Sequence, residues 1–271
     1  MTQKFFVILT ILIIILGISA SLALAKNEKG AGDPSTDSGQ VIPEEDGTYD
    51  VPGHPEIKVR VFIYHVKPSP SPTPTSSITC GLEDPTSNAV VDPTPWRLPS
   101  TTTFYYLNSG SVPSSVGGVN LQTIASNAFA QWTNVISNKV IIRNGGSTLI
   151  NRKALDGKNI IAWGAAPSSA LGVTYIWYYS GTGLVAEVDT IMNQKFFWMW
   201  SGISTCAYTN SYDAQSILTH ELGHWFGLDD EYTLDYKNNT MYGYGSKGDA
   251  KADTLTTGDI DGAKDIYNSF K

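Results

Sequence analysis

Two histidines and a glutamate are the residues best placed to do chemistry. His220 and His224 are four residues apart, with Glu221 beside the first, in the run HELGHWFGLDD. Side chains at i and i+4 lie on one face of a helix, so both imidazoles can bind one Zn²⁺ at ~2.0–2.1 Å. Glu221 then reaches the open side of the metal, where it can take a proton from water. The spacing predicts a metal centre with a general base.

A third ligand is expected just beyond this helix. Gly227 is a suitable residue to end the helix and to let the chain turn back. Asp230 then follows at a position from which its carboxylate can reach the metal. We therefore predict that His220, His224 and Asp230 bind one zinc ion, with the fourth position left open for water, as a catalytic site requires.

The elements that must position these residues follow an α+β pattern. Apolar residues recur at helical spacing over 119–136, which predicts an amphipathic helix. A second helix should begin near Ser211 or Asp213 and carry the histidines, and a third should cover 255–270. One helix, a group of strands and then two helices favour α+β over a doubly wound sheet. The predicted strands are 103–107, 139–143, 159–163, 171–178 and 184–192.

The N-terminus has the features of a secretory signal peptide. Lys4 precedes an apolar run over 5–18, and Ala23-Leu24-Ala25 is a small-residue cleavage pattern. We predict cleavage after Ala25 and an extracellular location. The alternative is an uncleaved membrane anchor over 5–25, which is just long enough to span a bilayer. The net charge is −7 and the chain contains no Lys/Arg run, which excludes nucleic acid as an expected partner.

The segment 26–79 is predicted to lie outside the catalytic domain. Residues 26–50 are polar and are expected to be disordered. Residues 57–66 alternate and are rich in β-branched side chains, which predicts one strand. Residues 68–75 read PSPSPTPT, a stiff extended linker. The catalytic domain is expected over 80–271, and the sequence leaves open whether 26–79 is an inhibitory pro-segment, a spacer or a small addition.

With the motif HELGHWFGLDD the chain resembles the metzincins, and among them the matrixins. The family pattern is HExxHxxGxxH followed by a turn with a methionine beneath the zinc, a place that Met241 fills here. The resemblance covers about 96–270 and implies a twisted five-stranded mixed sheet, three helices and a cleft with zinc at its floor. It also implies that 171–178 is an antiparallel edge strand, along which a protein or peptide substrate would pair.

Two departures from the family pattern bear on the metal. Asp230 stands where matrixins have histidine, and the only other histidines, His54 and His65, precede the Pro-rich linker. Asp229 and Glu231 are alternative carboxylates, but the family spacing favours Asp230. The calcium and structural zinc sites of the family have no matching residues here. We expect one zinc ion and no calcium.

The two cysteines allow two interpretations. Cys80-Gly81-Leu82-Glu83-Asp84 resembles the matrixin cysteine switch, whose thiolate binds zinc in the zymogen, but it lacks the flanking Pro-Arg and Pro-Asp. The other interpretation is a disulfide between Cys80 and Cys206 in an oxidising compartment, which we favour.

The resulting expectation is a secreted, monomeric zinc endopeptidase that acts on protein or peptide substrates. The alternative is an adhesion or binding module that keeps the fold and the metal without proteolysis. Glu221 is the residue that separates the two, because a module that only binds has no need of a general base.

Overall fold

The computed structural model describes residues 42–68, 78–80, 83–137, 139–200, 202, 206–250 and 252–268. They belong to one compact unit that spans 40–271. The predicted signal peptide, the polar residues up to 41 and nearly all of the Pro-rich linker lie outside the described residues. Within the described ranges, no helix combines the length and apolar character needed to cross a membrane.

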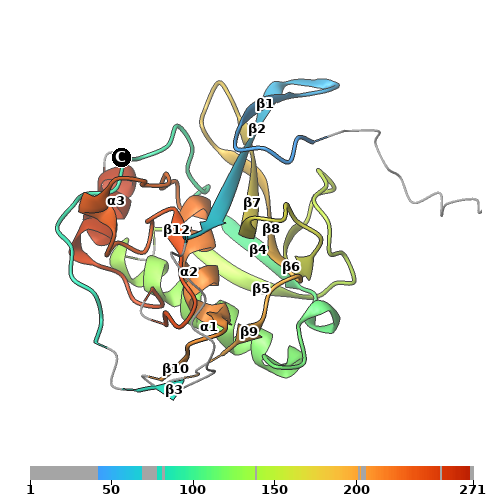
Figure 1. Cartoon of the computed structure of the whole chain (residues 1–271). Helices are drawn as coiled ribbons and strands as arrows, with labels where there is room; N and C mark the ends of the chain where they lie inside the picture. The colour runs from blue at the N-terminus through green and yellow to red at the C-terminus, as the bar shows by residue number, and fades with distance from the viewer. Residues whose placement is uncertain are drawn as a thin grey trace, which may run out of the picture. The chain divides into compact units, whose positions relative to one another are not determined.

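A mixed sheet of eight strands forms the centre of the molecule, in the order β1-β2-β7-β8-β6-β4-β5, with β12 joined to β2 (Figure 1). Strands β5, β4, β6 and β8 run parallel, whereas β7, β2 and β1 are joined by antiparallel pairing. The strand bounds are β1 Gly47–Val51, β2 His54–Val66, β4 Thr102–Leu107, β5 Ile141–Ser147, β6 Asn159–Gly164, β7 Ala170–Tyr179, β8 Val185–Asn193 and β12 Tyr244–Gly245.

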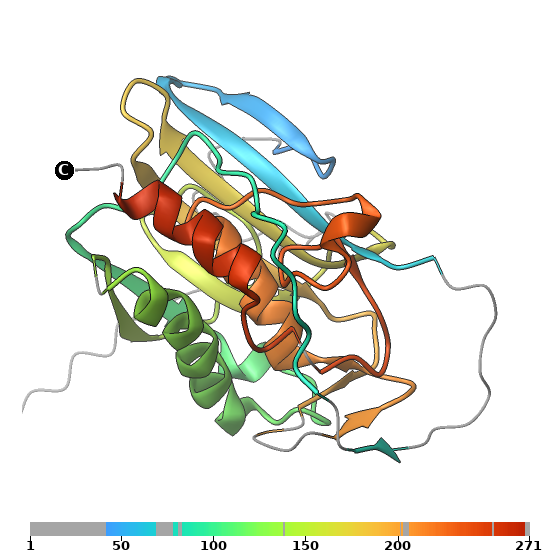
Figure 2. The same cartoon turned by 90° about the vertical axis from the view of Figure 1, so that its left-hand side faces the viewer.

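Three α-helices lie on one side of this sheet (Figure 2). They are α1 Leu121–Val135, α2 Ala214–Trp225 and α3 Thr257–Asn268. The predicted α+β class and the three predicted helices are confirmed. Helix α1 packs against both α2 and α3, and α2 also contacts strands β7 and β8. The short elements are η1 Ser109–Ser111, η2 Gly118–Asn120, η3 Leu234–Tyr236, β3 Ile78–Thr79, β9 Trp198–Met199, β10 Ala207–Tyr208 and β11 Tyr212–Asp213.

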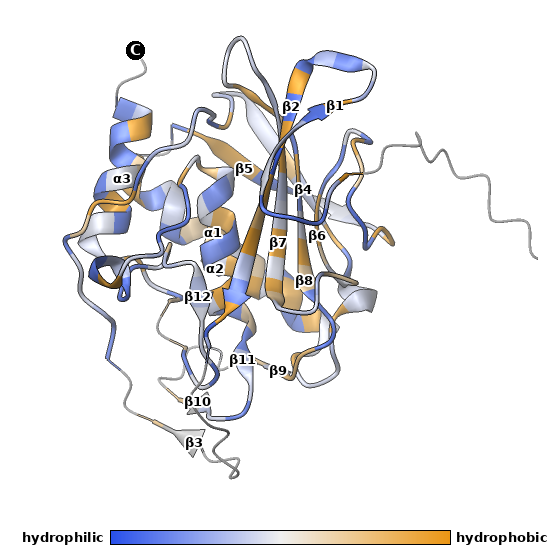
Figure 3. Cartoon of the chain, turned by 45° about the horizontal axis from the view of Figure 1, so that its top comes forward, coloured by the Kyte–Doolittle hydropathy of each residue, from blue (hydrophilic) through white to orange (hydrophobic). Residues whose placement is uncertain are grey.

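The sheet is apolar on both faces. The central strands are rich in hydrophobic residues (Figure 3). One core lies between the sheet and the helices, and a second, smaller core contains other residues of the same central strands. Strand β2 contributes to both, because neighbouring side chains of a strand point to opposite faces. Phe62 and Tyr64 belong to the core on the helical side, while Val61 and Ile63 belong to the second core.

The structure corrects three expectations about the sheet. The predicted five strands are eight, because β1, β2 and β12 extend the sheet. The predicted domain start at residue 80 is wrong, since β1 and β2 belong to the main sheet; β1 falls in a region predicted to be disordered. The strand predicted at 171–178 is not an edge strand, since β7 lies between β2 and β8.

A disulfide joins Cys80 to Cys206, with an S–S distance of 2.07 Å. It lies beside the two-residue pairing of β3 with β10. Both cysteines of the chain are used in this bond, so Cys80 has no thiolate to offer a metal.

Removal of this disulfide should destabilise the fold without altering the metal centre. The bond joins residues 126 positions apart, and a disulfide limits the conformational freedom of the unfolded chain. We expect the Cys80→Ser, Cys206→Ser chain to lose about 2–4 kcal/mol of unfolding free energy, measured by urea denaturation. In the presence of reductant, wild type and variant should unfold at the same urea concentration. A difference that persists there would assign the effect to the substitutions themselves.

Candidate metal centre

Helix α2 is buried along its whole length, which fixes the direction of its histidines. It begins after Asp213, whose side chain caps it by accepting a hydrogen bond from the backbone N–H of Ser216 at 2.8 Å. All twelve residues of the helix are buried. The indole N–H of Trp132 on α1 donates to the carbonyl oxygen of Thr219 at 2.8 Å and ties the two helices together.

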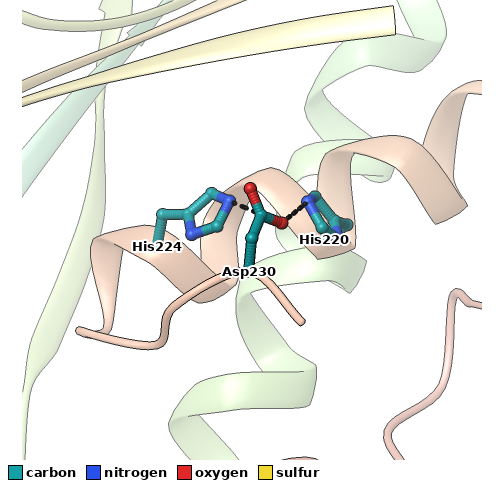
Figure 4. A group of neighbouring side chains, drawn as sticks. All are labelled: His220, His224 and Asp230. Atoms are coloured by element: carbon teal, nitrogen blue, oxygen red, sulfur yellow. Dashed lines mark ion pairs between the residues drawn. The ribbon is translucent and has the colours of Figure 1, made fainter. Parts of the chain in front are cut away.

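The two histidines of α2 meet Asp230 in one group (Figure 4). Nε2 of His220 lies 3.2 Å from Oδ1 of Asp230, and Nε2 of His224 lies 3.8 Å from the same oxygen. One ligand atom from each residue lies within 4.8 Å of the other two. The structure therefore brings together the three residues that the sequence proposed as ligands.

Hydrogen bonds on the far side of each ring set the histidine tautomers. Nδ1 of His220 lies 2.7 Å from the carbonyl oxygen of Thr240, and Nδ1 of His224 lies 2.9 Å from that of Leu228. A carbonyl oxygen only accepts, so both Nδ1 atoms carry a proton, and in the neutral ring Nε2 then presents its lone pair to Asp230. Burial lowers the pKa of His220, but the hydrogen bond and charge of Asp230 outweigh it and raise that pKa. Burial lowers the pKa of His224 to about 3, which keeps this ring neutral as a metal ligand must be.

Asp230 reaches the histidines because the chain reverses after α2. Gly227 has φ +95°, a left-handed conformation that favours glycine, and a side chain there would clash with the carbonyl oxygen of Trp96. Tyr232 donates its hydroxyl to Oδ2 of Asp230 at 3.2 Å, which leaves Oδ1 directed at the histidines. Burial alone would raise the pKa of Asp230, but His224, His220 and the Tyr232 hydroxyl outweigh it and hold that pKa below its usual value.

The two neighbouring carboxylates point elsewhere. Asp229 accepts the backbone N–H of Asp230 at 2.9 Å and lies 3.9 Å from the guanidinium of Arg60. Glu231 accepts the backbone N–H of Asp92 at 2.9 Å. Neither belongs to the group of possible metal ligands found among the described residues.

Glu221 lies under strand β7. The Thr174 hydroxyl donates to Oε2 of Glu221 at 2.5 Å, and a side chain at Gly172 would clash with Oε1. Burial raises the pKa of Glu221 to about 7, while His220 and the Thr174 hydrogen bond act in the opposite direction. A cation beside this carboxyl would lower its pKa further and favour the carboxylate, the form that accepts a proton.

The turn that contains Met241 packs against the helix of the histidines. Met241 is fully buried, and a side chain on Gly223 would clash with its sulfur, so the two residues are in close contact. The buried carboxylate of Asp259 on α3 accepts the backbone N–H groups of Thr240 at 2.9 Å and Met241 at 3.2 Å. This support also places the Thr240 carbonyl that orients His220.

Several residues of the site have no signal in the sequence. Thr174, Gly172 and Asp259 act through contacts with residues more than fifteen positions away. Tyr232 lies two residues after Asp230, yet its spacing alone predicts no hydrogen bond. These contacts depend on how the strands and helices pack, and local patterns do not encode that.

Strand β2 covers the group of ligands. The Phe62 ring stacks on His224 with centroids 3.8 Å apart, and the Tyr64 ring stacks on His220 with centroids 3.6 Å apart. The side chains of His220, His224 and Asp230 are 0% exposed. A cavity of about 540 Å³ opens beside Tyr64, and none of the three ligands lines it. The structure thus separates the ligands from solvent by β2.

Comparison with known proteins assigns no family: no family model matches the chain, and no curated protein matches it significantly.

Proposed function

We propose that this chain is a zinc-dependent endopeptidase, secreted if residues 1–25 act as the predicted signal peptide. One observation carries the proposal. Nε2 of His220, Nε2 of His224 and Oδ1 of Asp230 are fully buried and converge on one point, and among the described residues the contacts of these three atoms are those with one another. Buried polar atoms are rarely left without a partner, and a divalent cation would satisfy all three.

The number and type of these ligands favour a catalytic metal over a structural one. Structural zinc sites are closed by four protein ligands, whereas catalytic sites use three and leave one position open. Two neutral imidazoles and a carboxylate form such a three-ligand set. A Zn²⁺ held there would act as a Lewis acid on a carbonyl and would lower the pKa of water towards ~7.

The chain's own residues supply the proton transfer. Glu221 lies next to His220 on α2, and Thr174 holds its carboxylate by a hydrogen bond of 2.5 Å. The carboxylate would accept the proton of the attacking water and deliver it to the leaving amine of the substrate. The second candidate, a module that binds metal without proteolysis, gives no role to this held carboxylate.

The decisive experiment combines metal content with hydrolysis of casein. Because β2 covers the ligands, turnover is measured on the mature chain and on its Phe62→Ala, Tyr64→Ala variant. We expect one zinc per chain by elemental analysis, chelator-sensitive cleavage in the opened variant, and loss of both zinc and cleavage in His224→Ala. Zinc without any cleavage would favour the binding module. The absence of stoichiometric metal after refolding with zinc would contradict both candidates.

A further inference from the structure

Strand β2 lies beside β7, over the ligands. It pairs antiparallel with β7 from Ile57↔Tyr179 to His65↔Ala170. Thr174 and Gly172 are two β7 residues that contact Glu221. On β2, Phe62 pairs with Thr174 and Tyr64 pairs with Gly172. The strand therefore crosses the candidate base and the ligands at these two aromatic residues.

The other side of β2 is also bounded. Strand β12 pairs parallel with its end, matching Tyr244 to His65, and the backbone N–H of His65 donates to the carbonyl oxygen of Gly243 at 3.2 Å. The backbone N–H of Lys67 donates to the carbonyl oxygen of Gly245 at 2.9 Å. At this end β2 thus lies in a groove between β7 and the segment that follows Met241, and both sides bind its backbone.

The alternating side chains of β2 have two separate roles. Phe62 and Tyr64 face the imidazoles, while Val61 and Ile63 pack into the second core. Arg60 lies over the Phe62 ring at 4.2 Å and approaches Asp229, the residue before the third ligand. Backbone pairing therefore holds the strand in place, and its aromatic side chains close the site.

We infer that β2 is an intramolecular pseudosubstrate, and that the groove it occupies binds extended peptides with aromatic side chains at two positions, i and i+2. The inference rests on the proposed function and names the substrate class and the regulation of the same site. A substrate strand would need the backbone groups of β7 that β2 now uses, so β2 and substrate exclude each other. The faces of His224 and His220 form the two aromatic subsites.

Peptide binding tests the groove without metal or turnover. A fluorescent peptide with the sequence of His54–Val66 is titrated, with anisotropy as the readout, into wild type, the opened Phe62→Ala, Tyr64→Ala chain and the control Lys58→Ala. Lys58 lies on the same strand and pairs with exposed Asp50, away from the ligands. We expect binding to the opened chain at least about tenfold tighter than to wild type or to the control, because two stacked aromatic contacts no longer hold β2. Equal binding to all three chains would overturn the inference.

A second peptide tests whether the groove requires aromatic side chains. The same peptide with alanine in place of Phe62 and Tyr64 should bind the opened chain about tenfold more weakly. If both peptides bind equally, the groove does not select aromatic residues and the substrate class is wrong. Casein hydrolysis in parallel separates the two proposals: aromatic peptide binding without hydrolysis in any chain would retain the groove and remove the protease.

A second variant covers the case in which the opened chain fails to fold. Lys58 and Tyr178 are register partners, so Lys58→Cys with Tyr178→Cys can fasten β2 to β7 by a disulfide. Zinc release to EDTA should then be slower than from wild type and should return to the wild-type rate in reductant, with reduced wild type as control. Equal release from the fastened and the wild-type chain would show that the site opens without β2 leaving and would contradict the inference.

Discussion

Glu221→Gln should abolish nearly all turnover while leaving zinc and fold intact. Glutamine keeps the size of the side chain and can still accept the Thr174 hydroxyl, which lies 2.5 Å from Glu221. It cannot accept a proton from water, and general base catalysis contributes ~10²–10⁴-fold. We therefore expect kcat/KM for a peptide substrate to fall by about 10²–10⁴-fold in the opened Phe62→Ala, Tyr64→Ala background.

The controls separate chemistry from assembly. Zinc content and thermal unfolding of Glu221→Gln should match those of the parent chain, because Glu221 is not among the three ligands. Thr174→Val offers a weaker version of the same test, since it leaves the carboxylate in place and removes its hydrogen bond, together with the contact between the Thr174 and Thr190 hydroxyls. An unchanged kcat/KM in Glu221→Gln would mean that another group takes the proton.

Asp230→Asn should cost more than about 100-fold in zinc affinity, whereas Asp229→Asn should cost little. Loss of a residue that merely supports a ligand typically costs ~10–100-fold, and Asp230 directs Oδ1 itself at both histidines. Asp229 instead binds the backbone N–H of Asp230, and asparagine retains that acceptor. The two adjacent substitutions make the same chemical change at one ligand and at one non-ligand.

The measurement is competition for zinc with a chelator of known affinity at pH 7. Thermal unfolding with and without zinc is a second readout, because an ion that binds only the folded state raises its stability. Equal losses of zinc affinity in the two variants would indicate that both carboxylates contribute to the metal site. A larger loss in Asp229→Asn would move the third ligand to Asp229.

The local parts of the site are predictable from the sequence because short-range geometry sets them. Two histidines four positions apart lie on one helical face whatever the helix packs against. Gly227 and Asp230 follow the helix within five residues. The structure places Oδ1 of Asp230 3.2 Å from Nε2 of His220. The cap at Asp213 and the three helices depend in the same way on neighbouring residues.

The cover and the support of the site depend on contacts between residues far apart in the chain. The alternation over 57–66 predicts a strand, but it does not indicate which strand pairs with it. In the structure Val61 pairs with Tyr175, more than a hundred residues away. Strand pairing over such a distance depends on burying both faces of β2, one against the histidines and one in the second core. For that reason β1 and β2, which were expected to lie outside the catalytic domain, belong to its sheet. Strand β7, which was expected at the edge, is an interior strand.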